Sequence, residues 1–426
     1  MSKSSEPKEK SAGSKLTRRA RLVLIAMPIV ILGSGLIGME LYARHIGKFQ
    51  LWRYPLQKVA FADADRFKIY NQRFYKQRYK SFSQWPIKVP TFDADKPAPK
   101  YLFKPNQRVA LRAGVLVPAN PGETVLWSTN SWGFRGPEFQ IPKKESTIRI
   151  VCLGASTTEG LGLHDDQTYP YFLQKELNEK FPGQAIEVIN AGHHAFEIDD
   201  LVELLRQRVL PLQPDIVLFY EATNNINFNE FIKDVPKACP GDCWIDSGWK
   251  RFLYSRSAYF DLMADRFNWI NRQPAPMPHT LDIALPKRSV THYREGLRQI
   301  VQEALSHKTK IVLTSFITLA HEGAMYSYEE YPVLAPWFYK VHYPYTPGEV
   351  ARIYDVFNRQ SAEVAREFGV PYADLAADFP RTPQYFPIDL MHFSPEGDRL
   401  LAHKFAEFLA QEISPQITKT GAGRQP

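Results

Sequence analysis

An apolar run ends at a glycine and a serine-bearing turn in Ile148-Arg149-Ile150-Val151-Cys152-Leu153-Gly154-Ala155-Ser156-Thr157-Thr158. Its β-branched residues predict a buried strand, and the glycine predicts a tight turn at the carboxyl end of that strand. In open α/β folds the ligand crevice lies outside the carboxyl ends of the strands. We therefore expect Ser156 to stand at such a crevice.

Strands and helices alternate from residue 146 onward. Apolar spacing predicts strands at 148–153, 186–189, 216–220, 310–315 and 370–375, and helices at 169–181, 197–210, 293–306, 347–368 and 395–413. Ser394 is expected to cap the last helix, with Pro395 at its first position. This alternation predicts an α/β fold with a parallel central sheet and helices on both faces.

Three regions interrupt or precede this alternation. Residues 45–145 are rich in aromatic residues, basic residues and proline, and they predict an irregular stalk and accessory region. The dense segment at 127–136, Trp-Ser-Thr-Asn-Ser-Trp-Gly-Phe-Arg-Gly, either packs on the main domain or contacts substrate. The long connections 226–288 and 319–346 are either lids and binding walls or plain surface loops.

Basic residues are concentrated at the amino terminus. The 426-residue chain has a formal net charge of +8, but seven of its Lys and Arg residues fall within the first 21 positions, against Glu6 and Glu9. The remainder is nearly balanced, so the charge does not indicate a nucleic-acid partner. An apolar content of 44% suffices for one large globular domain and excludes general disorder.

An uncharged, mostly apolar stretch of 18 residues follows the basic tail, from Leu22 to Met39. As a helix it would be about 27 Å long, close to the thickness of a bilayer core, which predicts one transmembrane helix over 22–40. The positive-inside rule then places the tail in the cytoplasm and the body outside it, in the periplasm of a Gram-negative cell. The alternatives are a buried soluble helix and a cleavable signal peptide, for which Leu41-Tyr42-Ala43 is a poor cleavage site.

The three cysteines agree with an exported body. Cys239 and Cys243 could close a small disulfide loop in an oxidising compartment, whereas Cys152 is expected to be an inert buried thiol. Metal binding by the same pair would need two further ligands, and no CxxC or HExxH pattern supplies them. We expect neither a metal nor a cofactor.

Acyl transfer requires a nucleophile, a base, a group that orients the base, and donors for the negative charge that develops. Ser156 is the candidate nucleophile and His392 the candidate base. Asp389 lies three residues before His392, and on a turn this spacing lets the carboxylate reach Nδ1 of the imidazole and leave Nε2 facing the serine.

The donors for an oxyanion are expected at the ends of the next two strands. The Ser156 N–H, the unobstructed N–H of Gly192 and the side-chain amide of Asn224 are the candidates. His193 and His194 are expected at the rim. Glu221 and Asn225 are expected to support the site rather than to act in catalysis.

These four blocks, Gly-x-Ser-x-Thr at 154–158, Gly192, Asn224 and Asp-x-x-His at 389–392, appear in the order of the SGNH (GDSL-type) hydrolases, which the chain resembles over roughly 146–412. The resemblance implies a three-layer α/β/α domain of flavodoxin-like type, acyl-hydrolase chemistry, and an oxyanion hole formed by Ser156, Gly192 and Asn224. Ala155 replaces the aspartate of Gly-Asp-Ser. The usual Gly-x-Asn-Asp here reads Ala222-Thr223-Asn224-Asn225, so the register of the asparagines selects Asn224.

The expected organisation is a basic cytoplasmic tail (1–21), a transmembrane helix (22–40), a stalk and accessory region (41–145), an SGNH hydrolase domain (146–413) and a flexible tail (414–426). The accessory segment at 130–136 also resembles a stretch of membrane-anchored bacterial relatives that are often encoded near polysaccharide genes. The chain therefore resembles a membrane-anchored bacterial esterase of this family.

The leading hypothesis is an extracytoplasmic serine esterase that removes O-acetyl or other short acyl groups from a carbohydrate or cell-envelope polymer. An O-acyltransferase would use the same triad, with a sugar hydroxyl in place of water. A non-catalytic binding module in polysaccharide assembly is the third possibility, against which the intact Ser156, Asp389 and His392 argue. The expected partners are an acylated small molecule or polysaccharide and the membrane, and the sequence gives no oligomeric state.

Overall fold

The computed structural model describes part of the chain, in two compact units. The described residues are 17–46, 99, 102–112, 124–233, 257, 259–260, 263, 279–326, 334, 338, 341–342, 344–387 and 389–422. One unit comprises Met1–Ala60 and Cys239–Asn271, and the other comprises Phe61–Ala238 and Arg272–Pro426. Cys239 and Cys243 lie outside the described residues, so their disulfide stays a prediction.

The first unit contains helix α1 (Arg18–Ile46), which covers the segment for which the sequence predicts a membrane span. Near its end, the Glu40 carboxylate accepts hydrogen bonds from Ser257 Oγ at 2.7 Å and from the Tyr259 N–H at 3.0 Å. Within the described stretches, however, no helix has both the length and the apolar character needed to cross a bilayer. The transmembrane helix predicted over 22–40 is therefore not supported.

A five-stranded parallel sheet forms the centre of the second unit, as the sequence predicts. Its order is β4-β3-β5-β8-β9, the doubly wound order in which the first strand lies inside the sheet. The bounds are Thr147–Gly154 for β3, Ala185–Gly192 for β4, Ile216–Tyr220 for β5, Lys310–Thr314 for β8 and Tyr372–Ala373 for β9. Every residue of β3 is buried, which explains its unbroken apolar run.

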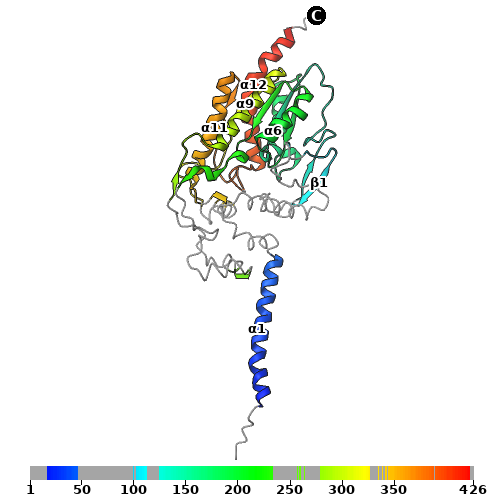
Figure 1. Cartoon of the computed structure of the whole chain (residues 1–426). Coiled ribbons are helices and arrows are strands. Elements are labelled where there is room, and N and C mark those ends of the chain that lie inside the picture. The colour runs from blue at the N-terminus through cyan, green and yellow to red at the C-terminus, as the bar shows by residue number, and fades with distance from the viewer. Residues whose placement is uncertain are drawn as a thin grey trace, which may run out of the picture. The chain divides into compact units, whose positions relative to one another are not determined.

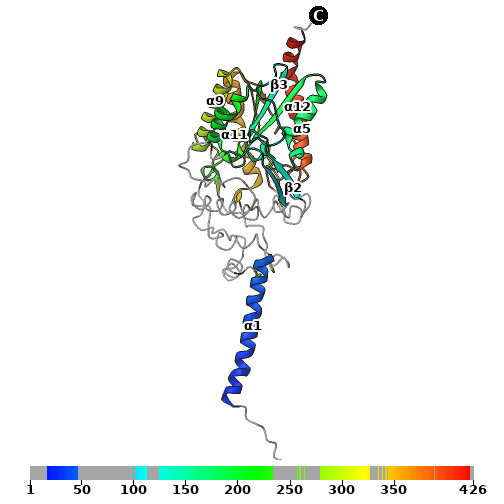
Figure 2. The ribbon, with the colours of Figure 1, turned by 90° about the vertical axis from the view of Figure 1, so that its right-hand side faces the viewer.

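Helices cover both faces of this sheet (Figures 1 and 2). On one face, α5 (Tyr169–Lys180) packs against α12 (Pro395–Ala422). On the other, α9 (Arg288–Ser306) packs against both α6 (Ile198–Leu204) and α11 (Pro347–Phe368). Figure 2 shows β3 between the α9–α11 layer and the α5–α12 layer, so the second unit is a three-layer α/β/α sandwich.

Local sequence signals fix the ends of these helices. Thr346 caps α11 in a capping box with Glu349, and Gly369 ends that helix with a left-handed φ of 65°. Before α12, Ser394 Oγ accepts a hydrogen bond from the Gly397 N–H at 3.1 Å. The predicted serine cap is thus present, and it fixes where the chain turns from the preceding loop into α12.

Short elements occur where the sequence predicts irregular chain. An antiparallel pair, β1 (Arg108–Arg112) and β2 (Thr124–Ser128), lies within the predicted stalk and accessory region. A second pair, β6 (Ile232–Lys233) and β7 (Thr280–Leu281), joins the two ends of the long connection 226–288. Strands this short carry little periodicity, so the sequence did not reveal them.

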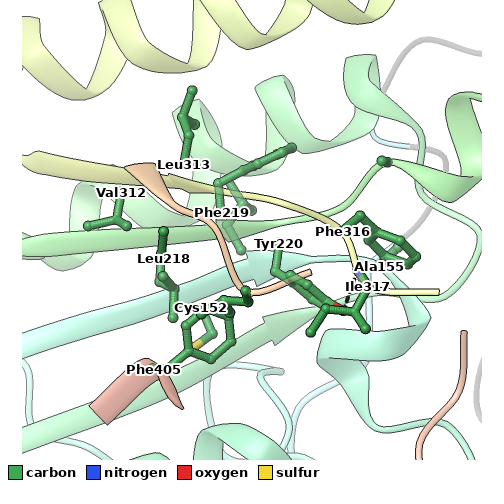
Figure 3. Packing of buried hydrophobic residues seen from close by; sticks show 14 of the residues in the cluster. Cys152, Ala155, Leu218, Phe219, Tyr220, Val312, Leu313, Phe316, Ile317 and Phe405 are labelled. Atoms are coloured by element: carbon green, nitrogen blue, oxygen red, sulfur yellow. Dashed lines mark hydrogen bonds between the residues drawn. The ribbon is translucent and has the colours of Figure 1, made fainter. Parts of the chain in front are cut away.

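Aromatic rings pack among aliphatic side chains in the core of the second unit (Figure 3). Tyr220 stacks on Phe316 with ring centroids 5.0 Å apart and meets Phe405 edge-on at 5.8 Å. Its hydroxyl accepts a hydrogen bond from the Ile317 N–H at 3.3 Å. Cys152 lies in the same core without exposure, and burial raises the pKa of its thiol, as expected for an inert cysteine.

Candidate active site

Ser156 stands directly beyond the carboxyl end of the central strand. β3 ends at Gly154, and Ser156 begins the four-residue helix α4 (Ser156–Glu159). A Cβ at Gly154 would lie 2.4 Å from the Tyr220 carbonyl oxygen and 2.1 Å from Thr158 Oγ1, so only glycine permits this tight exit from the sheet. Ser156 is 7% exposed, which leaves its hydroxyl at the margin of the protein interior.

The structure brings His392 and Asp389 to this serine. His392 Nε2 lies 2.8 Å from Ser156 Oγ, and His392 Nδ1 lies 2.6 Å from Asp389 Oδ2. The other carboxylate oxygen of Asp389 accepts the backbone N–H groups of Met391 and His392 at 2.9 and 2.8 Å. The carboxylate thus holds both the imidazole and the turn that carries it.

The charge state of Asp389 fixes the tautomer of His392. Burial raises the pKa of Asp389, but the His392 charge and the hydrogen bonds from His392 and Met391 outweigh it and leave that pKa below its ordinary value. An ionised carboxylate only accepts hydrogen bonds, so Nδ1 carries the proton and donates it to Asp389. Nε2 is then an acceptor for the Ser156 hydroxyl, the arrangement in which imidazole can act as a general base.

The turn after β5, η5 (Thr223–Asn225), presents Asn224. Its Nδ2 donates to the Phe196 carbonyl oxygen at 2.9 Å, and its backbone N–H donates to Glu221 Oε1 at 2.8 Å. A primary amide has two N–H bonds, so one further donor remains on Nδ2. Asn225 Oδ1 instead accepts the Ile198 N–H at 2.8 Å at the start of α6, which gives the two neighbouring asparagines different roles.

The Gly192 N–H is already engaged. It donates to Asn190 Oδ1 at 2.9 Å, and a Cβ on Gly192 would lie only 2.0 Å from the Glu159 nitrogen. Gly192 therefore marks a close approach of β4 to α4. For its N–H to bind an oxyanion, the hydrogen bond from this N–H to Asn190 Oδ1 would have to break. Further along the loop, Ala195 adopts a left-handed φ of 60° immediately before Phe196, whose carbonyl oxygen holds Asn224.

Both histidines predicted at the rim are buried. The His193 ring stacks on Phe103 at 4.4 Å and on Phe196 at 4.8 Å, and burial lowers its pKa to about 4. His194 donates its backbone N–H to Glu159 Oε2 at 2.8 Å, and its Nδ1 lies 2.8 Å from the same oxygen. Both side chains therefore pack in the interior behind the loop that follows β4, and neither lines the exposed surface of that loop.

The aromatic segment before the domain packs against the helix that carries Ser156. Trp127 is 2% exposed, and its Nε1 donates to Glu159 Oε1 at 3.2 Å. Phe134 and Arg135 are also 2% exposed. These three residues are therefore part of the protein interior and not of an exposed binding surface, whereas Trp132 is 40% exposed.

A small, shallow pocket opens beside the serine. Both Ser156 and His392 line it, together with Thr157, Gly160, Leu161, Leu163, Phe393 and Asp398. Thr157 Oγ1 is buried and has no hydrogen-bond partner among the described residues. The described part of the chain also contains no group of acidic, histidine and cysteine residues suited to a metal ion.

Sequence reasoning missed the residues that connect these parts. The sequence alone assigns no role to Glu159, yet its buried carboxylate joins α4 to Trp127 and His194. Burial raises the pKa of Glu159, but His194, Arg135 and His193 together lower it below its ordinary value. The sequence shows only that Glu159 lies three residues after Ser156, and this spacing does not indicate which residues its carboxylate binds.

Comparison with known proteins was made on sequence and on structure. The model of the GDSL-like lipase/acylhydrolase family matches residues 152–400. A lipase/acylhydrolase from Enterococcus faecalis is 16% identical and aligns over 63% of this chain and 96% of its own, with a TM-score of 0.37. The acetylxylan esterase Axe2 from Geobacillus stearothermophilus is 15% identical over 62% of this chain and 95% of its own, with a TM-score of 0.37. No protein with a curated description matches the chain.

The family match spans more than half of the 426 residues and includes the serine turn, Asn224 and the Asp389–His392 segment. The parallel α/β fold agrees with it. The chain belongs to the GDSL-like lipase/acylhydrolase family and is a hydrolase that acts on ester bonds.

Proposed function

We propose that this protein is a serine esterase in which Ser156 attacks the ester carbonyl and His392 takes its proton. The observation that carries the proposal is the 2.8 Å separation of His392 Nε2 from Ser156 Oγ, with Asp389 on the opposite ring nitrogen. Loss of the alcohol would leave an acyl group on Ser156, and water activated by His392 would release it as the acid. Asp389 keeps the imidazole in the required tautomer throughout.

The oxyanion formed in each step needs donors beside Ser156. The Ser156 N–H at the start of α4 and the remaining N–H of Asn224 Nδ2 are our candidates, and Gly192 would join them only by leaving Asn190. Preorganised donors of this kind are worth about 10²–10³ in rate each.

A short acyl group fits the surroundings best. Among the described residues, Ser156 and His392 share a shallow pocket that encloses no cavity for a long acyl chain. Leu161, Leu163 and Phe393 give it apolar walls suited to a methyl group. We therefore propose acetyl esters as the substrate class, in which a hydroxyl of a carbohydrate or envelope polymer carries the acetyl group.

The test compares wild type with Ser156→Ala and Ser146→Ala on a chromogenic acetyl ester. Ser146 is exposed just before the start of β3, at the other end of the strand. Ser156→Ala should lower turnover by several orders of magnitude and abolish covalent labelling by a serine-directed phosphonate, and Ser146→Ala should change neither. Labelling that survives in Ser156→Ala would identify another nucleophile and overturn the proposal.

Hydrolysis and transfer share the acyl-enzyme, so the acceptor must be measured directly. With an acetylated sugar as donor and a second sugar as acceptor, an esterase releases free acetate, whereas an O-acyltransferase yields acetylated acceptor. If the phosphonate labels Ser156 but the protein neither releases acetate nor acetylates the acceptor, acetyl esters are not its substrates. Location outside the cytoplasm stays a prediction from the sequence, and a reporter fused after residue 426, active only when exported, tests it.

A further inference from the structure

Arg135 is a buried arginine whose guanidinium is directed at the chain just after the nucleophile. Its side chain is 1% exposed. Nη1 donates to the carbonyl oxygens of Glu159 at 2.6 Å and Gly160 at 2.7 Å, and Nη2 donates to the Leu163 carbonyl oxygen at 2.5 Å. Nε donates to Asp165 Oδ1 at 3.0 Å. One side chain thus binds three successive parts of the loop that follows Ser156.

Arg135 makes the shorter bonds to the carbonyl groups of this loop, since the Glu159 carbonyl oxygen also accepts from Asn190 Nδ2 at 3.4 Å and the Gly160 carbonyl oxygen from the Leu163 N–H at 3.0 Å. α4 has only four residues, and Gly160, which follows it, adopts a left-handed φ of 78°. The last carbonyl groups of a helix have no partner inside it, and Arg135 supplies partners for Glu159 and Gly160.

The loop is connected directly to the nucleophile. The backbone N–H groups of Gly160 and Leu161 both donate to the Ser156 carbonyl oxygen at 3.0 Å. The Gly160 residue is therefore bonded to Arg135 through its carbonyl group and to Ser156 through its N–H. A shift of the guanidinium would be transmitted to the Ser156 backbone across a single residue.

Arg135 is itself held in place from its own segment. Its backbone forms isolated β-bridges with Thr129 and with Asn190 at the end of β4. Asp165 accepts from the Ser128 N–H at 3.1 Å as well as from Arg135, so the ion pair is tied to β2. The guanidinium is thus fixed by its backbone and by its carboxylate partner, as a positioning group must be.

We propose that Arg135, from the segment before the hydrolase domain, is a positioning residue for the nucleophile. It sets the place of Ser156 by clamping the carbonyl groups of Glu159, Gly160 and Leu163, and this role rests on the proposed function of Ser156. Arg135 does not line the pocket beside Ser156, and its guanidinium bonds to the chain that follows the nucleophile.

The variant that tests this role is Arg135→Lys. Lysine keeps the positive charge, but it lacks the planar fork that bonds several acceptors at once. Misplacement of a reacting group by about 1 Å can cost about 10²-fold in rate. We expect kcat for the acetyl ester to fall about 10- to 100-fold per folded molecule, with KM little changed, and the rate of phosphonate labelling of Ser156 to fall in parallel.

Arg149→Lys is the matched control. The Arg149 side chain is also 1% exposed, and it donates to the carbonyl oxygens of Leu212 and Gln140 and to Glu187. It lies near the amino-terminal end of β3, at the opposite end of the strand from Ser156. A purely structural role of a buried arginine would lower the melting temperature of both variants and leave kcat per folded molecule unchanged in both.

Asp165→Asn keeps the result decisive if Arg135→Lys does not fold. It neutralises the carboxylate that accepts from Arg135 Nε and from the N–H and hydroxyl of Ser128, and we expect labelling of Ser156 to slow several-fold. Labelling at the wild-type rate in the folded Arg135 or Asp165 variant would overturn the positioning role while leaving the esterase proposal intact. Wild-type protein that fails to label at Ser156 would instead overturn the proposed function itself.

Discussion

Thr223 Oγ1 donates a hydrogen bond to Met391 Sδ at 3.4 Å, and it lies 2.5 Å from the Tyr354 hydroxyl. Thr223 immediately precedes Asn224, and Met391 immediately precedes His392. The turn that carries the candidate oxyanion donor therefore contacts the turn that carries the candidate base. Because Tyr354 belongs to α11, the same contact ties both turns to a long, regular helix.

Thr223→Val should therefore destabilise the protein by more than its small change in shape suggests. It leaves the buried Tyr354 hydroxyl without this partner, which costs about 1–3 kcal/mol. Tyr354→Phe removes the orphaned hydroxyl, so the double variant should be less destabilised than the sum of the two single variants. Denaturant unfolding of all four proteins measures this coupling, and additive free energies of unfolding would show that the contact contributes nothing.

Asp389→Asn should lower kcat by about 10⁴-fold without a comparable loss of stability. An amide that donates to the imidazole favours the tautomer in which Nε2 carries the proton, and that imidazole cannot accept the proton of Ser156. Asp378→Asn is a suitable control, because Asp378 pairs with Lys404 on the surface. Turnover of an acetyl ester by both variants provides the measurement, and equal rates would show that Asp389 does not orient the base.

Asn224→Ala should lower kcat by about 10²–10³-fold, since it removes an amide donor beside the developing oxyanion. Asn225→Ala should act mainly on stability, because Asn225 Oδ1 accepts the first N–H of α6. Thermal unfolding and ester turnover of the two variants distinguish the roles. A larger rate loss in Asn225→Ala would reverse our assignment of the two asparagines.

Glu221→Gln should change how stability depends on pH. Burial raises the pKa of Glu221 to about 8, the hydrogen bond from Asn224 opposes this shift, and the nearby Glu197 charge adds to it. Between the ordinary carboxyl pKa of about 4.5 and 8, the folded protein holds a proton that the unfolded chain releases. This group therefore lowers the free energy of unfolding as pH rises, by up to about 1.4 kcal/mol per pH unit.

Melting temperatures of wild type and Glu221→Gln measured from pH 4 to pH 9 test the sign. The variant has no carboxyl group at this position to ionise, so its advantage over wild type should grow from about pH 4.5 and level off above about pH 8. A constant difference across this range would mean that Glu221 does not hold its proton in the folded state.

Gly192→Ala should displace α4 from the end of β4. Its Cβ would lie 2.0 Å from the Glu159 nitrogen and 2.5 Å from the Thr158 carbonyl carbon. Both are main-chain atoms, so no change of rotamer can relieve the clash. We expect a loss of about 1–3 kcal/mol and slower phosphonate labelling of Ser156. Gly183→Ala introduces strain at a φ of 88° in open space, so it should cost stability without slowing the labelling.

The sequence was most informative where the signal is local. The strands at 148–153, 186–189 and 216–220 and the cap at Ser394 follow from apolar runs, glycines and a serine–proline pair, and the structure has each of them. The short spacing of Asp389 and His392 likewise predicted that their side chains could meet, and they lie within hydrogen-bonding distance.

Contacts between distant segments could not be predicted in the same way. Nothing in the sequence around Arg135 indicates that its guanidinium binds the carbonyl groups of Glu159 and Gly160, because backbone acceptors carry no sequence signal. The sequence predicts that the N–H of Gly192 faces the site. Its bond to Asn190 depends on the rotamer of the Asn190 side chain, for which the sequence carries no signal. The Thr223–Met391 contact depends in the same way on how two loops are placed by the sheet.

The bridge from Arg135 to Asn190 also bears on how the protein behaves in solution. β4 is the edge strand of the five-stranded sheet, and the accessory segment lies against its carboxyl end. Unpaired main-chain groups on an exposed edge are a template for pairing with another chain. A shortened protein that starts at residue 146 would uncover the main-chain groups of Asn190 at this edge, so we expect it to self-associate as well as to lose activity.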